Sequence, residues 1–327
     1  MKSGRMAAAL LTVLLGCGLT ACGSGTGTED AKAAGGGPFP VTVQGKLGEA
    51  QIAHRPRRVV ALDWTSADIA VTLGVRPVAI ASVAGAPNGI EPWTAARLGG
   101  SAPERFSTTN GDPIEKIASY RPDLILAAKD YNLTDSYPKL SRLAPVVHYT
   151  GGPNADSWER STQVIGRALG TEDRANRLIA ETKEAIGKAR GELSSLRDKS
   201  FSFLVAPQAN GVHVVNSGRD VSARLLGQLG LRLSAPVQRL PDSSTVGRAK
   251  LSYETLGTAD ADVVFATGQP DSLQALKDNP AFGTLAAVRA GHYIPLEPQL
   301  AQAVAFPSPG SLQWSLRQLV PKLRALH

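Results

Sequence analysis

The chain is poor in the side chains that build most catalytic and metal sites. Its two cysteines, Cys17 and Cys22, both lie within the first 22 of 327 residues, so the rest of the chain can form neither a disulfide nor a zinc–thiolate site. The five histidines are widely spaced, which argues against direct capture of zinc or manganese. No P-loop, dinucleotide fingerprint or G-x-S-x-G motif supports a nucleotide-dependent enzyme or a hydrolase. We therefore expect no catalytic residues, no resident metal and no cofactor.

Charge of one sign is not concentrated anywhere in the chain. The formal net charge is +7, but the basic residues are scattered, and the densest group is Arg55-Pro56-Arg57-Arg58. A nucleic-acid-binding surface needs clustered basic residues, so we expect no nucleic-acid partner.

The N-terminus carries the features of an exported lipoprotein. Lys2 and Arg5 precede an apolar stretch, residues 6–15, that is too short to span a bilayer. Leu19-Thr20-Ala21-Cys22 follows and resembles the bacterial lipobox, in which cleavage precedes a cysteine that becomes acylated. The alternative is an ordinary secretory signal with a chance cysteine. We expect a signal peptide over residues 1–21 and a lipid on Cys22, which would anchor the chain to the outer face of the bacterial cytoplasmic membrane.

Beyond the leader, residues 22–38 are rich in Gly, Ala and Thr and predict a flexible tether. Runs typical of buried strands then alternate with helical patterns, which predicts an α/β fold with mostly parallel sheets. The first unit, residues 57–82, places Trp64 directly after a strand at residues 59–62. Because ligands bind at the carboxyl ends of strands in open parallel sheets, Trp64 is a candidate ligand contact. We expect a long loop over residues 83–105, with Trp93 in it.

Apolar residues recur at helical spacing from Ala175 to Leu193 and predict a helix of about 25 residues. A second series of strands begins near Phe201. We expect an N-terminal lobe over residues 39–155, a helical linker with this spine helix over 156–198, and a C-terminal lobe over 199–327.

Short segments follow one another in a recognisable order: PRRVVAL at 56–62, LGVRPV at 73–78, RPDLIL at 121–126, ADVVF at 261–265 and NPAF at 279–282. Together, and behind a lipobox, they resemble the helical-backbone family of ABC-transporter substrate-binding lipoproteins, specifically the iron–siderophore binders. The resemblance covers residues 39–327. It implies two α/β lobes joined by one long helix, a ligand cleft between the lobes, and small opening motions.

The same resemblance implies a function. We expect a monomeric lipoprotein that captures an Fe(III)–siderophore outside the cytoplasmic membrane and delivers it to the permease dimer of an ABC importer. Haem or a cobalamin-like corrinoid on the same scaffold is the alternative ligand, and a secreted α/β enzyme is the alternative class.

Two glutamates are candidates for permease docking. Glu115 and Glu254 open helices in the two halves, each a similar interval before a buried strand. By the family pattern, one glutamate per lobe docks onto arginine pockets of the permease, a contact suited to charge-assisted pairing. The alternative for each is a carboxylate that stabilises a helix N-terminus.

The candidate ligand-binding residues lie on loops after strands and are either aromatic or donors: Trp64, Trp93, Tyr131, Asn216, Arg219, Arg239 and Arg248. Aromatic rings offer flat apolar area, and arginines can donate to a chelate that is often anionic and already saturates its iron. The alternatives are a packing role for Trp93 and a solvated surface position for each arginine. Trp314 lies in an expected C-terminal helix, and we expect it in the core.

Overall fold

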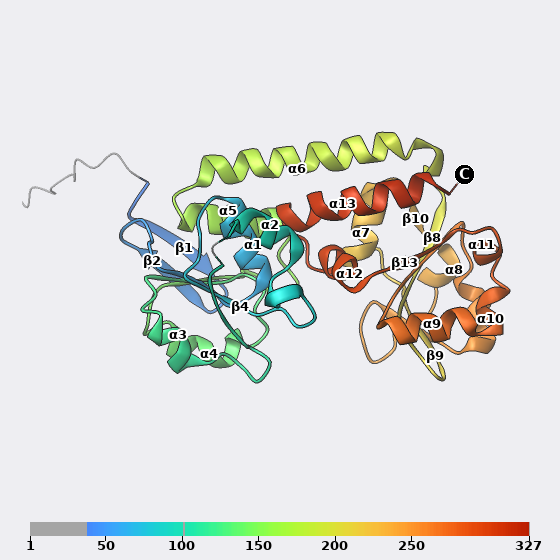
Figure 1. Cartoon of the computed structure of the whole chain (residues 1–327), viewed down its shortest axis with the longest axis horizontal. Helices are drawn as coiled ribbons and strands as arrows, with labels where there is room; N and C mark the ends of the chain where they lie inside the picture. The colour runs from blue at the N-terminus through green and yellow to red at the C-terminus, as the bar shows by residue number, and fades with distance from the viewer. Residues whose placement is uncertain (1–37, 101, 327) are drawn as a thin grey trace, which may run out of the picture. The chain divides into compact units, whose positions relative to one another are not determined.

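The computed structural model describes residues 38–100 and 102–326. Cys22, the expected signal peptide and almost all of the expected tether lie outside these residues. The described part of the chain contains two β-sheets with helices on both faces, and a separate hairpin of β1 (Val41–Gly45) and β2 (Gly48–Ile52). Figure 1 shows how these elements are arranged.

The first sheet is the centre of what we call the N-lobe, residues 41–148. Its five strands are all parallel, in the order β5-β4-β3-β6-β7. The strands are β3 (Val59–Ala61), β4 (Ala79–Ala81), β5 (Glu104–Phe106), β6 (Leu124–Ala127) and β7 (Val146–His148). The helices are α1 (Trp64–Thr72), η1 (Pro87–Gly89), α2 (Pro92–Leu98), α3 (Ile114–Ser119) and α4 (Leu133–Leu140).

Alternation along the strands explains why helices cover both faces of this sheet. Val59 and Ala61 belong to one apolar cluster with α1, whereas Val60 joins a second cluster with the buried side chains of α3 and α4. Successive side chains of a strand point to opposite faces, so an uninterrupted apolar run needs cover on each side. The parallel sheet expected from the sequence is confirmed.

The expectation of a long loop over residues 83–105 is wrong. This segment contains η1, α2 and the start of β5. Pro92 opens α2 at its first turn, where a missing N–H costs nothing, and Gly99 ends it with φ 63°. Both signals are local and were available in the sequence.

The second sheet is the centre of the C-lobe, residues 200–296, and it is mixed. Its order is β11-β9-β8-β12-β13, with β10 also paired to β8. The strands are β8 (Ser200–Gln208), β9 (Gly211–Val215), β10 (Arg232–Leu233), β11 (Arg248–Leu251), β12 (Val263–Thr267) and β13 (Tyr293–Leu296). The pairs β8–β9 and β9–β11 are antiparallel and the others parallel. The helices are α7 (Val221–Gln228), α8 (Ala235–Gln238), η3 (Tyr253–Ala259), α9 (Pro270–Asp278), α10 (Pro280–Gly283) and α11 (Ala286–Arg289).

Four further helices cover or connect the lobes: α5 (Trp158–Ala168), α6 (Glu172–Glu192), α12 (Pro298–Ala305) and α13 (Pro309–Arg324). The 21-residue α6 is the expected spine, because Ala175 and Leu178 belong to an N-lobe core whereas Ile186 and Ala189 belong to a C-lobe core. Helix α13 packs along α6 and also contacts α1 and α2. Helix α6 thus joins the lobes as expected, and α13 runs beside it with contacts to both lobes (Figure 1).

A buried carboxylate of α1 is hydrogen-bonded to the residue that caps the start of α13. Asp68, 1% exposed, accepts hydrogen bonds from Ser308 Oγ and, at 3.2 Å, from Thr94 Oγ1. A Cβ added to Gly310 would lie only 2.4 Å from Asp68 Oδ1, so the absence of a side chain at residue 310 permits this approach. Within the described residues, no helix is both long and apolar enough to cross a membrane.

Candidate functional site

A cavity of about 160 Å³ opens at the carboxyl ends of the N-lobe strands. Residues that follow four of these strands line it: Leu62, Asp63 and Trp64 after β3, Ala81 at the end of β4, Thr108 after β5, and Lys129, Asp130, Tyr131 and Asn132 after β6. Phe306, from the segment between α12 and α13, closes the wall. We call this the strand-end cavity. It lies where ligands bind in open parallel sheets.

Asp63 sets the position of Trp64. Its carboxylate caps α1 by accepting from Ser66 N at 2.8 Å and Ser66 Oγ at 2.7 Å, and it also accepts from Lys129 N at 3.0 Å. These bonds join the loop after β3 to the loop after β6. Burial raises the pKa of Asp63, although the hydrogen bonds from Ser66 and Lys129 oppose that shift. Trp64 is thereby held half-buried as the first residue of α1, with its ring edge-to-face on Phe306 at 5.1 Å.

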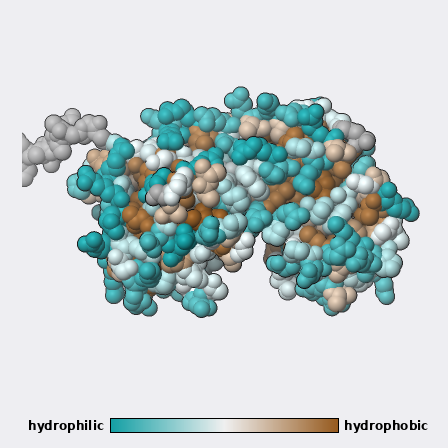
Figure 2. Space-filling view, in the orientation of Figure 1, coloured by the Kyte–Doolittle hydropathy of each residue, from teal (hydrophilic) through white to brown (hydrophobic). Residues whose placement is uncertain are grey.

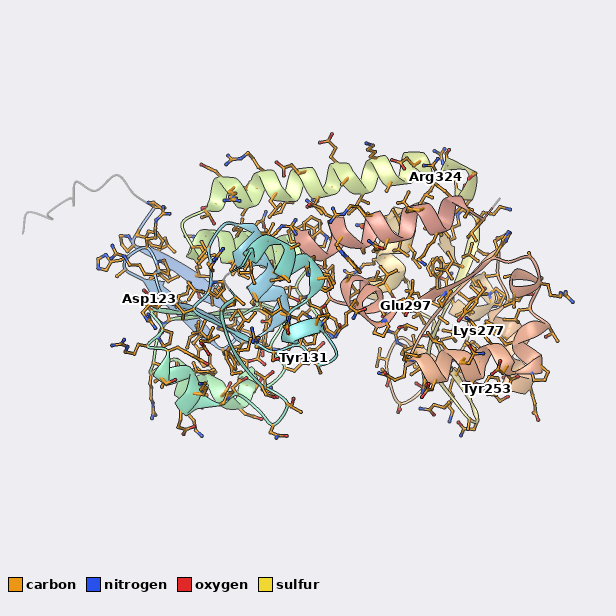
Figure 3. All side chains as sticks on the ribbon, viewed as in Figure 1. Asp123, Tyr131, Tyr253, Lys277, Glu297 and Arg324 are labelled. Carbon is orange, nitrogen blue, oxygen red and sulfur yellow. The ribbon has the colours of Figure 1, made fainter. Side chains whose placement is uncertain are left out.

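Tyr131 is the most exposed aromatic side chain of the cavity wall, with 59% of its surface accessible. Figure 3 places it at the margin of the N-lobe that faces the C-lobe. Trp64, Tyr131 and Phe306 together give the cavity three aromatic rings, none of them fully buried. Trp64 and Tyr131 are two of the residues expected to contact a ligand. Rings in such positions supply large contact area at little entropic cost.

A second cavity, of about 220 Å³, lies between the two lobes. Lys129 lines both cavities, and Arg224 of α7 lines the second from the C-lobe side. Lys129 is 7% exposed and donates from Nζ to the carbonyl of Asp156 at 2.7 Å. Burial lowers its pKa, and nearby Asp63 and Asp156 oppose this. Figure 2 shows the surface hollowed between the N-lobe and the C-lobe. A larger groove of about 650 Å³ is lined only by α6 and α13 and is remote from the strand ends.

Asp130 is a second buried acid of the strand-end cavity with a raised pKa. It is 4% exposed; Oδ1 accepts from Asn132 N at 2.9 Å, and Oδ2 has no hydrogen-bond partner. Burial, and then the adjacent carboxylate of Asp112, raise the pKa of Asp130 to about 8. Asp112 accepts from Ser136 Oγ at 2.5 Å, while its Oδ1 is buried without a partner. The carboxyl groups of Asp112 and Asp130 are thus neighbours, and of the two only Asp130 lines the cavity.

Trp93 lies away from both cavities. It is 3% exposed in α2, and its ring packs on Trp314 of α13 at 5.3 Å. A ring so enclosed has little surface to offer a ligand, so its position agrees with the packing alternative and argues against the ligand role. Trp314 is half-buried against the C-lobe core, in keeping with the expected packing role.

The four predicted C-lobe residues line neither of the two cavities. Asn216 Nδ2 donates to the Leu240 carbonyl and to Asp242 Oδ1, both at 2.9 Å, so it shapes the loop before β11. Arg248 pairs with Asp220 at 3.0 Å. Arg219 and Arg239 are exposed, as their surface alternative requires. Their ligand roles stay predictions, and Arg224 is better placed than any of them.

Sequence reasoning missed Phe306, Asp130, Lys129 and Arg224. Lys129 and Asp130 had a local signal, because they directly follow a buried strand. Phe306 had none, since it reaches the N-lobe only when α13 packs on α1.

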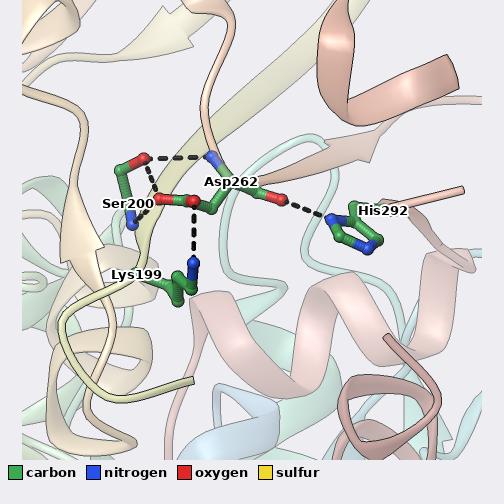
Figure 4. A network of polar contacts seen from close by, with 4 residues as sticks. All are labelled: Lys199, Ser200, Asp262 and His292. Carbon is green, nitrogen blue, oxygen red and sulfur yellow. Dashed lines mark hydrogen bonds and ion pairs between the residues drawn. The ribbon is translucent and has the colours of Figure 1, made fainter. Parts of the chain in front are cut away.

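Glu115 and Glu254 occupy matching positions. Both are exposed in the first turn of a helix, and each lies nine residues before the strand next to the central strand of its sheet, β6 or β12. In each lobe, the aspartate directly before this strand accepts hydrogen bonds from backbone N–H groups at or just before the start of the neighbouring strand. Asp123 accepts from the backbone of Arg57 and Arg58 at 2.8 Å, and Asp262 accepts from Ser200 N at 2.7 Å (Figure 4).

Among the residues that the structure describes, no three His, Cys, Asp or Glu side chains come together to hold a metal ion. The site therefore consists of a cavity with aromatic walls, two buried acids and a shared lysine. This arrangement can enclose and release a molecule; we identify no nucleophile paired with a base in it.

Comparisons with known proteins agree with this geometry. A family described as "Periplasmic binding protein" matches residues 59–300. The Bacillus subtilis protein YhfQ, provisionally named an ABC transporter substrate-binding lipoprotein, is 28% identical over 97% of this chain and 94% of its own length. A periplasmic solute binding protein from Mycobacterium smegmatis superimposes with a TM-score of 0.77 at 30% identity, covering 88% of this chain and 99% of that one. Streptococcus pneumoniae PiaA in complex with ferrichrome gives a TM-score of 0.72 at 26% identity over 88% and 98%.

Proposed function

The chain belongs to the periplasmic binding protein family, and on that premise we propose that it captures a ferric siderophore and delivers it to an ABC importer. The observation that carries the proposal is the aromatic strand-end cavity, which adjoins a second cavity between the lobes through Lys129. Together the two cavities reach the lower range of small-molecule sites, about 300–1,000 Å³. The fold shared with PiaA in complex with ferrichrome supports the same ligand class.

The composition of the site suits an iron chelate rather than a free ion. A siderophore already supplies the oxygen ligands of its iron, so the protein needs shape and contact area instead of metal ligands. Trp64, Tyr131 and Phe306 provide that area, and Lys129 and Arg224 provide positive charge beside it for the anionic chelate oxygens.

A titration of intrinsic tryptophan fluorescence tests the ligand class. We expect quenching on addition of a ferric trihydroxamate, because Trp64 lies in the cavity wall. Trp64→Phe should remove most of the quenching, whereas Trp93→Phe, which changes a ring packed on Trp314, should keep it. Binding of haem or cobalamin without binding of any ferric siderophore would refute the proposal.

We also propose that Glu115 and Glu254 dock onto the permease, one from each lobe. Their exposure and matched spacing before β6 and β12 support this role, and the Asp123 and Asp262 contacts fix each helix-to-strand segment against its sheet. Exposed carboxylates can pair with arginines of a partner through charge-assisted hydrogen bonds.

The docking proposal requires a cell-based assay. Glu115→Ala and Glu254→Ala should abolish or strongly reduce uptake of a radiolabelled ferric siderophore while the purified proteins bind it normally. Glu184→Ala, an exposed glutamate of α6, is the matched control and should leave uptake unchanged. Full uptake by the double variant of Glu115 and Glu254 would show that docking uses other residues.

A further inference from the structure

We propose that the strand-end cavity is a subsite for a positively charged arm of the ligand, so that the preferred ferric siderophore carries a protonated amine. This inference rests on the proposed function and specifies its substrate class. It concerns Asp130, which the cavity wall contains and which none of the preceding roles uses.

Asp130 is a buried acid whose side-chain neighbour is another acid. It is 4% exposed, its Oδ2 receives no N–H or hydroxyl donor, and it can hydrogen-bond to the carboxyl of Asp112 only through a shared proton. Asp63 is a third acid, and its charge also raises the pKa of Asp130. The cation nearest in sequence is Lys129, which lines the same cavity. Lys129 directs its Nζ to the carbonyl of Asp156 instead of to Asp130. Buried carboxylates of this kind need either a proton or a cationic partner.

Three aromatic side chains share the cavity with this acid. Trp64, Tyr131 and Phe306 line the same cavity as Asp130, and the rings of Trp64 and Phe306 stand edge-to-face. Aromatic faces attract ammonium groups through their quadrupoles, and a carboxylate in the same cavity adds an ionic partner for an organic cation. The cavity volume of about 160 Å³ suits a short amine-bearing arm and not a whole chelate.

The neighbouring cavity contains a cation, Arg224, that the strand-end cavity lacks. Its lining includes Lys129 and Arg224 together with the acids Asp156 and Glu159, so anionic oxygens of the ferric centre would lie against the two cations while the arm enters the strand-end cavity. Lys129 stands at the junction of the two. A chelate whose anionic oxygens contact Lys129 and Arg224 would direct a positively charged arm toward Asp130. The pKa of Asp130, about 8, agrees with a carboxyl that holds a proton when the site is empty and releases it to solvent when an ammonium group enters.

The test compares two ligands that differ by one charge. Ferrioxamine B is a linear ferric trihydroxamate that ends in a primary ammonium, and its N-acetylated form has the same chelate with a neutral end. We expect the full mature chain to bind the ammonium form at least about tenfold more tightly, a difference of about 1.4 kcal/mol. Isothermal titration calorimetry at pH 7.5 measures both affinities.

Two matched variants locate the effect. Asp130→Asn keeps an oxygen for the Asn132 N–H but removes the charge, so the preference for the ammonium form should fall below about twofold. Asp135→Asn removes an exposed acid of α4 that does not line the cavity and should keep the preference. Equal affinity of the wild-type protein for the two ligands, or an unchanged preference in Asp130→Asn, overturns the cationic subsite and leaves capture of ferric siderophores standing. Binding of neither ligand overturns the subsite, and only loss of binding to every ferric siderophore tested would also overturn the proposed function.

Discussion

Replacement of Gly310 by alanine should weaken the joint at which the last helix meets the N-lobe. The new Cβ would lie 2.4 and 2.5 Å from the two carboxylate oxygens of Asp68, where unstrained contacts need more than 3.0 Å. Asp68 cannot easily retreat, because it is 1% exposed and accepts from Ser308 and Thr94. The clash must therefore displace either the start of α13 or the buried carboxylate.

The expected cost follows from three contributions. Overpacking of a buried site costs about 1–3 kcal/mol. Loss of one hydrogen bond to the carboxylate adds about 1.5–3 kcal/mol where the displacement breaks it. Alanine gains about 1 kcal/mol over glycine inside a helix, which offsets part of this. We expect Gly310→Ala to lower the free energy of unfolding by about 2 kcal/mol.

Urea denaturation followed by circular dichroism measures this change, and the chain offers a matched control. Gly187 lies inside α6, and a Cβ there would meet open space, so Gly187→Ala should raise the free energy of unfolding by about 0.5–1 kcal/mol. In an Asp68→Ala background the clash is absent, and Gly310→Ala should then stabilise as well. Wild-type stability or better for Gly310→Ala alone would refute the reasoning.

Three further predictions concern other parts of the chain. Trp64→Ala should weaken ferric siderophore binding by about 1–3 kcal/mol in a calorimetric titration, because the ring forms part of the cavity wall, and unchanged affinity would return it to a packing role. Glu91 is 1% exposed with no hydrogen-bond partner, and burial, then Asp68, raise its pKa to about 7. Its folded-state pKa lies above the unfolded value of about 4.5, so stability should fall by about 2 kcal/mol as the pH rises from 4.5 to 7. In Glu91→Gln, the urea midpoint should no longer fall between pH 4.5 and 7 through this group. If the midpoint falls as in the wild-type protein, another group causes the pH dependence. Cys22→Ala should abolish labelling by a radioactive fatty acid and leave the protein unanchored, and retained label would place the lipid elsewhere.

The parts that the sequence predicted well depend on local patterns. Apolar runs such as Leu124–Ala127 identify strands buried on both faces, and the helical spacing from Ala175 onward identifies α6, although the helix is 21 residues long and shorter than expected. The parallel order of the first sheet then follows from the alternation of strands and helices.

The remaining features depend on contacts between distant segments. Burial of Trp93 requires Trp314, and the Asp68–Ser308 bond joins residues 240 positions apart. The neighbouring acids Asp112 and Asp130 come from different loops, and no spacing rule brings them together. The arginines expected at the ligand illustrate the same limit, because only the fold shows that Arg248 is already paired with Asp220.

The position of α13 also sets the order in which this protein can be completed during synthesis. The contacts of α1 and α2 with α13 cannot form until residues beyond Ser308 have been made, although the strands of the N-lobe were made long before. Until then Asp68 lacks its partner Ser308, and Trp93 lacks the ring of Trp314. If the chain is exported N-terminus first, its N-lobe would lack these contacts until the last residues have crossed the membrane. During that time the incompletely packed N-lobe would be open to proteolysis or to binding by a chaperone.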